Sequence, residues 1–375
     1  MRYLALVVIF CTQIFANPQN PEVISGKVEF EEIANTLSVH TDEKAIIDWE
    51  SFSISENEKT SFIQPSSESI VLNRVLGEIG SEILGGLESN GYLFLINPMG
   101  ILIGKEARVD VGGLVASTLD IQNSDFDEQT WHFYGPSEES VLNLGNIETT
   151  GGHICLVGKK VENQGVMNAN GGSASMIGTS EVMIQLNEGS PIFYRVWTSD
   201  MEEQDSLSAI KVEDDSFELF EEDGEVFVVG PSDVINKGVV QSAGGKIYLL
   251  GDQIDLQEES LLDVSDSGDA GSVFVGGFQG HYYEDFGNLG IVTDPNAQIL
   301  AHSTDDGNGG KVILLSQGGN SFNGLVYARG GPNGGNGGVV QIAGLEKLNF
   351  LGNVDIFAPN GYMGSLFISP FINIK

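Results

Sequence analysis

The sequence predicts an all-β protein whose chain winds into a parallel β-helix, also called a β-solenoid. The first observation behind this prediction is that glycine accounts for 49 of the 375 residues. The second is that, beyond residue 140, a glycine, a Gly-Gly pair and a further glycine recur at one fixed spacing. The copies with identical spacing are Gly145/Gly151/Gly158, Gly165/Gly171/Gly178 and Gly238/Gly244/Gly251. A repeating unit of about 20 residues with short strands is typical of coils that stack into a solenoid.

Short strand-like segments lie between these glycines, and their alternating side chains predict an apolar interior. Ile154 and Leu156 in one copy, and Ile247 and Leu249 in another, are expected to point inward. Each strand would then pair with the equivalent strand of the next coil, and glycine would accommodate a positive φ at the corners. An antiparallel sandwich is disfavoured, because its hairpins would place Asn-Gly or Asp-Gly turns, rather than Gly-Gly pairs, at a regular period.

Residues 187–230 interrupt the glycine pattern, contain no Gly-Gly pair and are rich in acidic side chains. Apolar residues alternate around an Asp-Gly step in this segment, with Phe217 and Leu219 before it and Val226 and Val228 after it. This alternation predicts a hairpin that projects from the solenoid between two coils. The acidic side chains are expected to form a solvated face. A divalent-cation site is the alternative, although no spacing matches a known calcium loop.

The chain is strongly acidic, with 53 Asp and Glu residues against 17 Lys and Arg residues and a formal net charge of −36. Such a chain lacks the basic surface that neutralises phosphates, so nucleic acid is excluded as a partner and anionic lipid is disfavoured. Apolar residues make up 41% of the sequence, which is too much for a disordered acidic tail. The histidines form no metal-ligand spacing, and we predict neither a metal nor a cofactor.

The first 16 residues are predicted to be a secretory signal peptide. Arg2 is followed by an apolar run from Tyr3 to Cys11, and Ala16 supplies a small residue at the expected cleavage site. The run is shorter than the roughly 20 residues that span a bilayer, and no later segment is apolar enough to cross one. Lipidation at Cys11 is the less favoured alternative. Removal of the signal peptide leaves Cys155 as the single cysteine, so we expect an exported chain without a disulfide.

An ordered series of motifs follows between residues 22 and 135. It consists of Ala45–Ile54, Phe62–Pro65, Val71–Val75, Ile83–Gly85, Asn90–Ile101 and Gly113–Leu119. On these motifs the segment resembles the N-terminal haemagglutination-activity domain of filamentous haemagglutinin-type exoproteins, which belong to the two-partner secretion (TPS) pathway. Asn73-Arg74-Val75 is similar to the haemophilus-type adhesin branch of that family, while Met99 stands where the family has an asparagine in its Asn-Pro-Asn-Gly motif.

The resemblance implies a fold, a route and a function. The fold would be a right-handed parallel β-helix with an N-terminal cap, and the hairpin insertion would lie outside the coils. The chain would be recognised by a dedicated outer-membrane β-barrel transporter, secreted or held at the bacterial surface, and would act as an adhesin towards a host-cell or carbohydrate receptor. Together with the sequence patterns above, it predicts a signal peptide at 1–16, a TPS domain at 17–140, coils at 141–186, the acidic insertion at 187–230 and further coils at 231–375.

Two short motifs are the candidate contacts with the transporter, carried over from the resemblance. They are Asn73, Arg74 and Val75, and Asn97, Pro98, Met99 and Gly100. From the residues alone, both motifs have a structural alternative. Asn97 and Pro98 favour a turn that ends one coil, and Gly100 allows the return into the next strand. An isolated arginine among acids, such as Arg74, more often pairs with a carboxylate than binds a partner.

A polysaccharide-degrading enzyme is the alternative function, because parallel β-helices also host lyases and hydrolases. The arginines that remain after the signal peptide are Arg74, Arg108, Arg195 and Arg329, and none of them stands beside an aspartate cluster in the sequence. Asp263, Asp266 and Asp269 are interspersed with serine and glycine, which is typical of a polar corner. His281–Tyr283 is either a sugar-stacking patch or, more simply, a loop. We therefore predict that the protein is not an enzyme. A third possibility is that the chain is the secretion module of a longer exoprotein.

Overall fold

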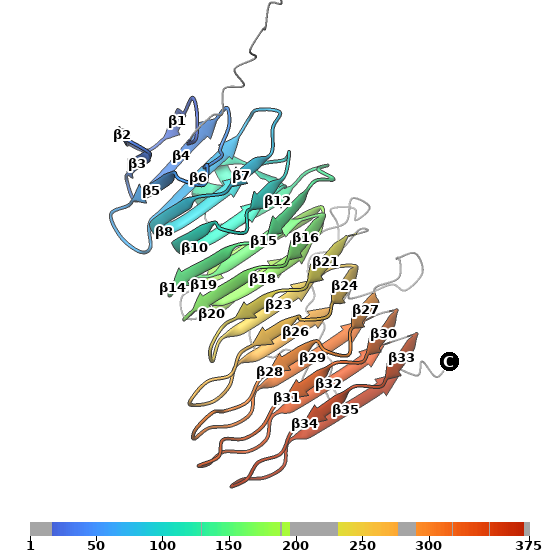
Figure 1. Ribbon diagram of the computed structural model, residues 1–375. Coiled ribbons are helices and arrows are strands. Elements are labelled where there is room, and N and C mark those ends of the chain that lie inside the picture. The colour runs from blue at the N-terminus through green and yellow to red at the C-terminus, as the bar shows by residue number, and fades with distance from the viewer. Residues whose placement is uncertain are drawn as a thin grey trace, which may run out of the picture.

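The computed structural model describes residues 17–128, 130–187, 190–195, 232–276, 290–316, 318–344 and 346–370. Over these residues the chain forms a stack of β coils that runs from an N-terminal cap to a last coil ending at β35 (Figure 1). A regular coil contributes one strand to each of three parallel sheets, called sheets 1, 2 and 3 below. Equivalent strands of successive coils pair in parallel, which confirms the predicted parallel β-helix.

Sheets 1 and 2 share two long strands, β8 (Gly86–Ile96) and β10 (Arg108–Ser117), which pass through the corner between them. The other strands of sheet 1 are β2 (Val28–Ile33), β3 (Thr36–Thr41), β5 (Lys59–Ile63), β14 (Asn146–Thr150), β17 (Val166–Asn170), β22 (Val239–Gln241), β25 (Leu261–Asp263), β28 (Gln298–Leu300), β31 (Leu325–Tyr327) and β34 (Asn353–Asp355). The other strands of sheet 2 are β1 (Glu22–Ser25), β4 (Lys44–Trp49), β6 (Ile70–Val75), β15 (Ile154–Gly158), β18 (Ser173–Gly178), β23 (Lys246–Leu250), β26 (Ser272–Gly276), β29 (Lys311–Ser316), β32 (Val339–Gly344) and β35 (Ser365–Pro370).

Sheet 3 closes the triangular cross-section of the coils and contains short strands. They are β7 (Ser81–Ile83), β9 (Ile101–Ile103), β13 (Ser140–Asn143), β16 (Lys160–Asn163), β21 (Asp233–Asn236), β24 (Gln253–Leu256), β27 (Gly290–Thr293), β30 (Gly319–Phe322) and β33 (Lys347–Phe350). Every pairing recorded in this sheet is parallel.

The N-terminal end of the stack is capped by antiparallel pairing. Strand β2 forms a hairpin with β3, and β1 runs antiparallel to β4. An antiparallel hairpin cannot template a further parallel coil, so the cap ends the stack at this side. The cap that the resemblance implied is therefore present.

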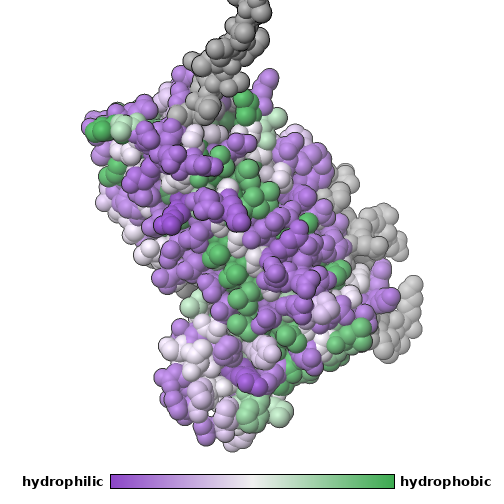
Figure 2. Space-filling view, viewed as in Figure 1, coloured by the Kyte–Doolittle hydropathy of each residue, from purple (hydrophilic) through white to green (hydrophobic). Residues whose placement is uncertain are grey.

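The interior of the coils is apolar and continuous from the cap to the last coil. Ile154, Leu156, Ile247 and Leu249 have no exposed surface and belong to this single core, as the alternation predicted. The Gly-Gly corners are also as predicted, since Gly151 adopts a φ of 82°. On the outside, hydrophilic residues dominate the face seen in Figure 2, and apolar residues gather there in a broken strip along the stack.

A ladder of buried asparagines links neighbouring coils where sheet 3 turns into sheet 1. Asn143 donates from Nδ2 to Asn163 Oδ1 at 2.8 Å, and Asn163 donates in the same way to Asn236 at 2.8 Å. Asn236 then donates to Ser260 Oγ at 2.6 Å. All three asparagine side chains are fully buried. Each of these side-chain amides donates to a partner in the next coil. The ladder can therefore fix the register of the stack without leaving these buried amide N–H groups unpaired.

A small antiparallel sheet lies outside the coils and was not predicted. Its strands are β11 (Asp120–Ile121), β12 (Thr130–Tyr134), β19 (Glu181–Asn187) and β20 (Ser190–Arg195), and helix α1 (Asn123–Glu128) connects the first two. This extra-helical sheet covers the outer side of sheet 2, where the ring of Trp131 packs against Phe94 with centroids 4.6 Å apart. The chain therefore leaves the coils twice, first after β10 and again at β19. The hairpin predicted around residue 223 lies outside the described residues.

Candidate functional site

The two motifs predicted to contact the transporter are neighbours in space. Both lie where strands of sheet 2 end and the chain turns toward sheet 3. Arg74 in β6 is the register partner of Ile96 in β8, and Asn97 follows Ile96 directly. On its other side, Arg74 is paired with Asp48 of β4. The parallel register thus brings both motifs to one corner of the stack.

Asn73 and Val75 point into the interior of the coils. The Trp49 indole Nε1 donates a hydrogen bond to Asn73 Oδ1 at 3.0 Å, and Asn73 Nδ2 donates to the Phe94 carbonyl oxygen at 3.2 Å. Asn73 has no exposed surface and Val75 is 3% exposed. In the folded domain these two side chains belong to the core and have no surface that a partner could touch.

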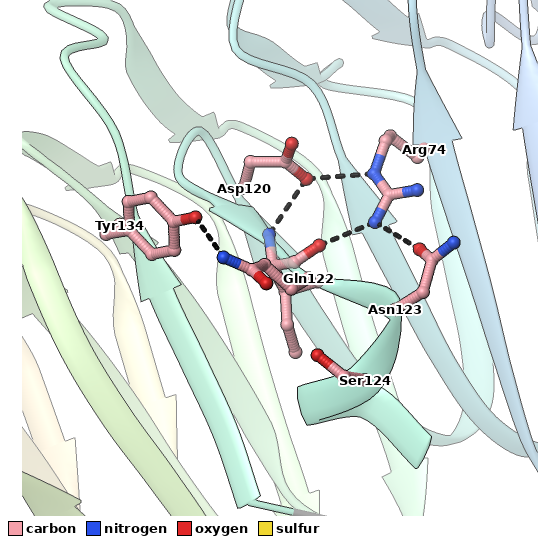
Figure 3. Close-up of a pocket in the computed structure, with 7 residues that line it drawn as sticks. Arg74, Asp120, Gln122, Asn123, Ser124 and Tyr134 are labelled. Carbon is pink, nitrogen blue, oxygen red and sulfur yellow. Dashed lines mark hydrogen bonds and ion pairs between the residues drawn. The ribbon is translucent and has the colours of Figure 1, made fainter.

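Arg74 points outward but is buried beneath the start of the extra-helical sheet (Figure 3). Its Nε donates to Asp120 Oδ1 at 2.9 Å, and its Nη1 donates to Asp48 Oδ1 at 3.1 Å. Its Nη2 donates to the Ile121 carbonyl at 2.5 Å and to Asn123 Oδ1 at 2.9 Å. Arg74 therefore pairs with two carboxylates, which is the structural alternative that the sequence suggested.

The electrostatics of this cluster depend on burial. Burial raises the pKa of Asp48 above its ordinary value, and this effect outweighs the opposite effect of the neighbouring Arg74 guanidinium. The Asp120 carboxylate also acts to raise the pKa of Asp48. A poorly solvated carboxylate needs a cation beside it, so Arg74 both offsets the charge of Asp48 and ties the coils to the extra-helical sheet.

Asn97 organises the turn between β8 and β9. Its Oδ1 accepts a hydrogen bond from the Met99 N–H at 2.9 Å, and its carbonyl accepts one from the Gly100 N–H at 3.0 Å. Its Nδ2 donates to the Ile79 carbonyl and to Ser81 Oγ, both at 3.0 Å. Gly100 has a φ of 103°, which favours glycine. The turn that the residues predicted is therefore formed, and Asn97 joins it to the preceding corner loop.

Of the seven candidate contact residues, Met99 alone has an exposed side chain. It is 44% exposed, whereas Asn97 is fully buried. Pro98 is half-buried, and its carbonyl accepts a hydrogen bond from Ser137 Oγ at 2.6 Å. Direct contact with a transporter at these positions stays a prediction. If the contact is made with the folded domain, it falls on the side chain of Met99 and on its loop.

Sequence reasoning missed the residues that complete the Arg74 cluster. Asp120 and Asn123 lie in the extra-helical segment, and a pocket of about 420 Å³ opens between them, Arg74 and Tyr134 (Figure 3). Among the residues that line it, Gln122 Nε2 donates to the Tyr134 hydroxyl at 2.7 Å. Each guanidinium nitrogen of Arg74 already has a protein acceptor, so the pocket offers little free charge to a ligand.

The positions weighed for enzymatic or metal chemistry have structural partners. Asp263 accepts a hydrogen bond from the Ser265 N–H at 3.0 Å, and Asp266 accepts one from the Gly268 N–H at 2.9 Å, as in the predicted polar corner. Among the residues that the structure describes, no group of three His, Cys, Asp or Glu side chains could hold a metal ion. The His281–Tyr283 segment lies outside those residues. None of the described helices has the length and apolar character needed to cross a membrane.

Comparison with known proteins identifies relatives for both the sequence and the fold. Residues 15–192 match the family model of the TPS secretion domain. The chain is 27% identical over 273 residues to a heme/hemopexin-binding protein of Haemophilus influenzae, covering 65% of this chain and 28% of that protein. A second heme/hemopexin-binding protein of Haemophilus influenzae is 34% identical over 118 residues, which are 31% of this chain and 13% of that protein. The matched parts are thus only a fraction of these relatives.

The fold has a counterpart among solved structures. The crystal structure of the HMW1 secretion domain from Haemophilus influenzae superposes with a TM-score of 0.56 at 24% sequence identity. The alignment covers 93% of this chain and all of that domain. At this level of identity the likeness shows the shared β-helix fold.

Proposed function

We propose, from the match of residues 15–192 to the TPS secretion domain family, that an outer-membrane β-barrel transporter recognises this chain and passes it to the cell exterior. The observation that carries the proposal is the family match. The matched segment contains the cap, the first coils and most of the extra-helical sheet. The cluster of Arg74 joins these parts, so they can act as one recognition unit.

We further propose that the secreted chain is an adhesin, or the secretion module of one. A long stack of coils presents an extended lateral surface, which repeat proteins commonly use for binding. The net charge of −36 disfavours anionic lipid and nucleic acid as ligands and leaves proteins or carbohydrates as the receptor class. No observation favours a polysaccharide-degrading activity.

Export needs a source of free energy, because no nucleotide pool lies beside the outer membrane. We propose that folding of successive coils at the cell surface draws the chain outward. Each coil hydrogen-bonds to the one before it, so stability is gained step by step. The interior asparagine ladder and the parallel register support this proposal, since both form only when neighbouring coils meet.

The proposed transport is tested by secretion in a strain with and without its two-partner transporter. The chain is expected in the culture medium or on the cell surface only when the transporter is present. Deletion of residues 17–135 should retain the chain in the periplasm, whereas deletion of the last coils from residue 346 onward should not. Equal secretion without the transporter would reject the proposal.

A second candidate function is binding of haem or hemopexin. It is favoured by the two relatives from Haemophilus influenzae, whose names state this binding. The test is a titration of the purified chain with haemin, followed by the absorbance of the bound haem, and a pull-down with hemopexin. An unchanged haem spectrum together with no hemopexin captured would exclude this candidate for the present chain.

A further inference from the structure

The two ends of the stack of coils differ in how their strand edges are protected. At the N-terminal end, β1 and β2 run antiparallel to their neighbours, and the exposed strand β2 carries Glu29, Glu31 and Glu32. Charged side chains and reversed direction both hinder another chain from pairing with an edge. At the other end, the pairings of β33, β34 and β35 within the described residues are all with the preceding coil (Figure 1). We call this last described coil, residues 346–370, the open end.

The apolar interior of the coils is exposed at the open end. Leu366 and Ile368 of β35 are the register partners of Val340 and Ile342, which are fully buried in the preceding coil. Leu366 and Ile368 are nonetheless 37% and 46% exposed, because no further strand covers them in the described part of the chain. Other side chains of this coil are also only partly buried against the core, namely Leu348, Phe350, Val354 and Ile356.

The loop between β34 and β35 adds large exposed side chains to the same coil. Phe357 is 51% exposed, Tyr362 is 83% exposed and Met363 is 69% exposed. Phe357 and Met363 also line a hollow of about 480 Å³ beside β31 and β34. Apolar side chains that gather in one place mark an interaction surface more often than scattered ones do.

The charge of the open end favours a second copy of this chain as its partner. The whole chain has a formal net charge of −36. Residues 318–344 and 346–370, by contrast, contain only four charged side chains, and their formal charges cancel: Arg329, Glu346, Lys347 and Asp355. Two copies that approach through acidic parts of their surfaces repel each other, whereas two open ends can meet without net repulsion.

We propose that the open end binds the open end of a second copy, so that two stacks join end to end in a dimer with two-fold symmetry. The cap of the second copy is excluded from this contact by its antiparallel hairpin and its glutamates. Strands that meet across the two-fold axis run antiparallel, so their free N–H and carbonyl groups can pair. The contact would also bury Leu366 and Ile368. Because both copies use the same surface, assembly stops at two.

The dimer goes beyond the proposed function and does not depend on it. A coil that forms at the cell surface exposes its open end there, so two secreted chains could join outside the cell. The dimer would present two lateral surfaces on one elongated particle, and two linked sites bind a receptor-covered surface more tightly than one.

The first test is sedimentation equilibrium of the purified chain, with an edge variant and a matched control. Wild type is expected to show a monomer–dimer equilibrium that tightens in high salt, since salt screens the repulsion between the acidic bodies. The edge variant carries Leu366→Glu and Ile368→Glu and should dimerise at least about tenfold more weakly. The control carries Val23→Glu and Ile24→Glu in the cap, where these residues are 39% and 41% exposed, and should stay within about twofold.

The second test needs no substitution, so it holds even if the edge variant loosens its last coil. Amide hydrogen exchange of wild type is measured from dilute to concentrated solution. Amides of β33, β34 and β35 should become protected as the dimer forms, while those of β1 and β2 should not change.

Four outcomes would overturn the proposal. They are a wild type that stays monomeric up to about 1 mM, assembly beyond two copies, equal weakening by the edge and control substitutions, and protection of the β33–β35 amides that is complete in the dilute monomer. The last result would mean that the chain covers its own open end.

Discussion

Trp49 and Asn73 are joined by a hydrogen bond of 3.0 Å inside the coils, from the indole Nε1 to the side-chain carbonyl oxygen. They lie on neighbouring strands of sheet 2, β4 and β6. The same asparagine donates to the Phe94 carbonyl of the next coil. One buried amide thus connects three successive coils, and the ring of Trp49 meets Phe52 edge to face at 5.6 Å.

Replacement of Asn73 tests whether this position is structural. Asn73→Ala leaves the Trp49 N–H without its partner and opens a small cavity, so we expect the free energy of unfolding to fall by about 2–3 kcal/mol. Urea unfolding followed by tryptophan fluorescence measures the change. Met99→Ala is the control on the neighbouring loop and should change it by less than about 0.5 kcal/mol. Similar values for both variants would contradict the structural role.

Arg74 is expected to be far less tolerant of replacement than an arginine on the surface. Arg74→Lys cannot reach Asp48, Asp120 and the Ile121 carbonyl together, and it leaves a poorly solvated carboxylate partly uncompensated. We expect a loss of about 2–4 kcal/mol and faster amide exchange in β11 and β12. The control is Arg329→Lys, because Arg329 pairs with Asp355 at the surface and its side chain is 49% exposed.

The control Arg329→Lys should lower the free energy of unfolding by less than about 1 kcal/mol. Hydrogen exchange separates the two effects, since loss of the Arg74 cluster should loosen the extra-helical sheet while the asparagine ladder stays protected. Uniform loosening of all coils in Arg74→Lys would show that the cluster does not act as a local clamp.

Stability should fall when the pH drops from neutral to about 4, and His153 is one cause. Burial lowers the pKa of His153 to about 4, and its Nδ1 accepts a hydrogen bond from the Ser173 N–H at 3.0 Å. The unfolded chain has a histidine pKa near 6.5 and therefore binds more protons between these values. Folded stability is full above about pH 6.5 and decreases by about 3 kcal/mol as the pH falls to 4.

The contribution of His153 is isolated by comparison with His153→Gln at each pH. The unfolding free energy of wild type minus that of His153→Gln should decrease as the pH falls from about 6.5 to 4, because only the wild type takes up the proton on unfolding. NMR titration of the His153 ring gives the pKa directly. A ring that titrates near 6.5 in the folded protein would refute the assignment.

The repeating part of the fold was accessible from the sequence because its signals are local. The glycine spacing placed the corners, and the alternation of Ile247 and Leu249 is carried by residues within one strand. The extra-helical sheet was not accessible, because Trp131 pairs with Ile184 across the β12–β19 ladder and no local pattern joins them. For the same reason the sequence motif marked Arg74 as a candidate residue but gave no sign of Asp120, which becomes its partner only in the folded chain.

The two glycines of a Gly-Gly corner are required for different physical reasons, and this gives a further prediction. Gly151 has a φ of 82°, and a Cβ added to it would have no heavy atom within 4 Å apart from its chain neighbours. A Cβ on Gly152, in contrast, would lie 1.9 Å from the Gly112 carbonyl oxygen of the preceding coil. Gly151→Ala should therefore cost about 1 kcal/mol through its backbone conformation alone.

Gly152→Ala should be much more damaging, at about 3 kcal/mol or more, because the clash is with backbone and separates two coils. Thermal and urea unfolding of the two variants check the order. Gly151→Asn should recover part of the loss, since asparagine tolerates a positive φ. Equal losses of stability in Gly151→Ala and Gly152→Ala would mean that the close contact between neighbouring coils is not the reason why Gly152 must be glycine.

Export driven by coil formation predicts that one interior proline blocks secretion. Leu249 in β23 is fully buried and pairs with Met176 in the coil before and Val275 in the coil after. Leu249→Pro removes the N–H and the strand geometry, so the coil cannot join the ladder on either side. If folding pulls the chain outward, the variant should stall with its N-terminal part outside the cell, whereas Leu249→Val, which keeps the pairing, should be secreted. Protease accessibility of the stalled chain on whole cells locates the arrest. Normal secretion of Leu249→Pro in an unfolded state would show that the free energy for export comes from elsewhere.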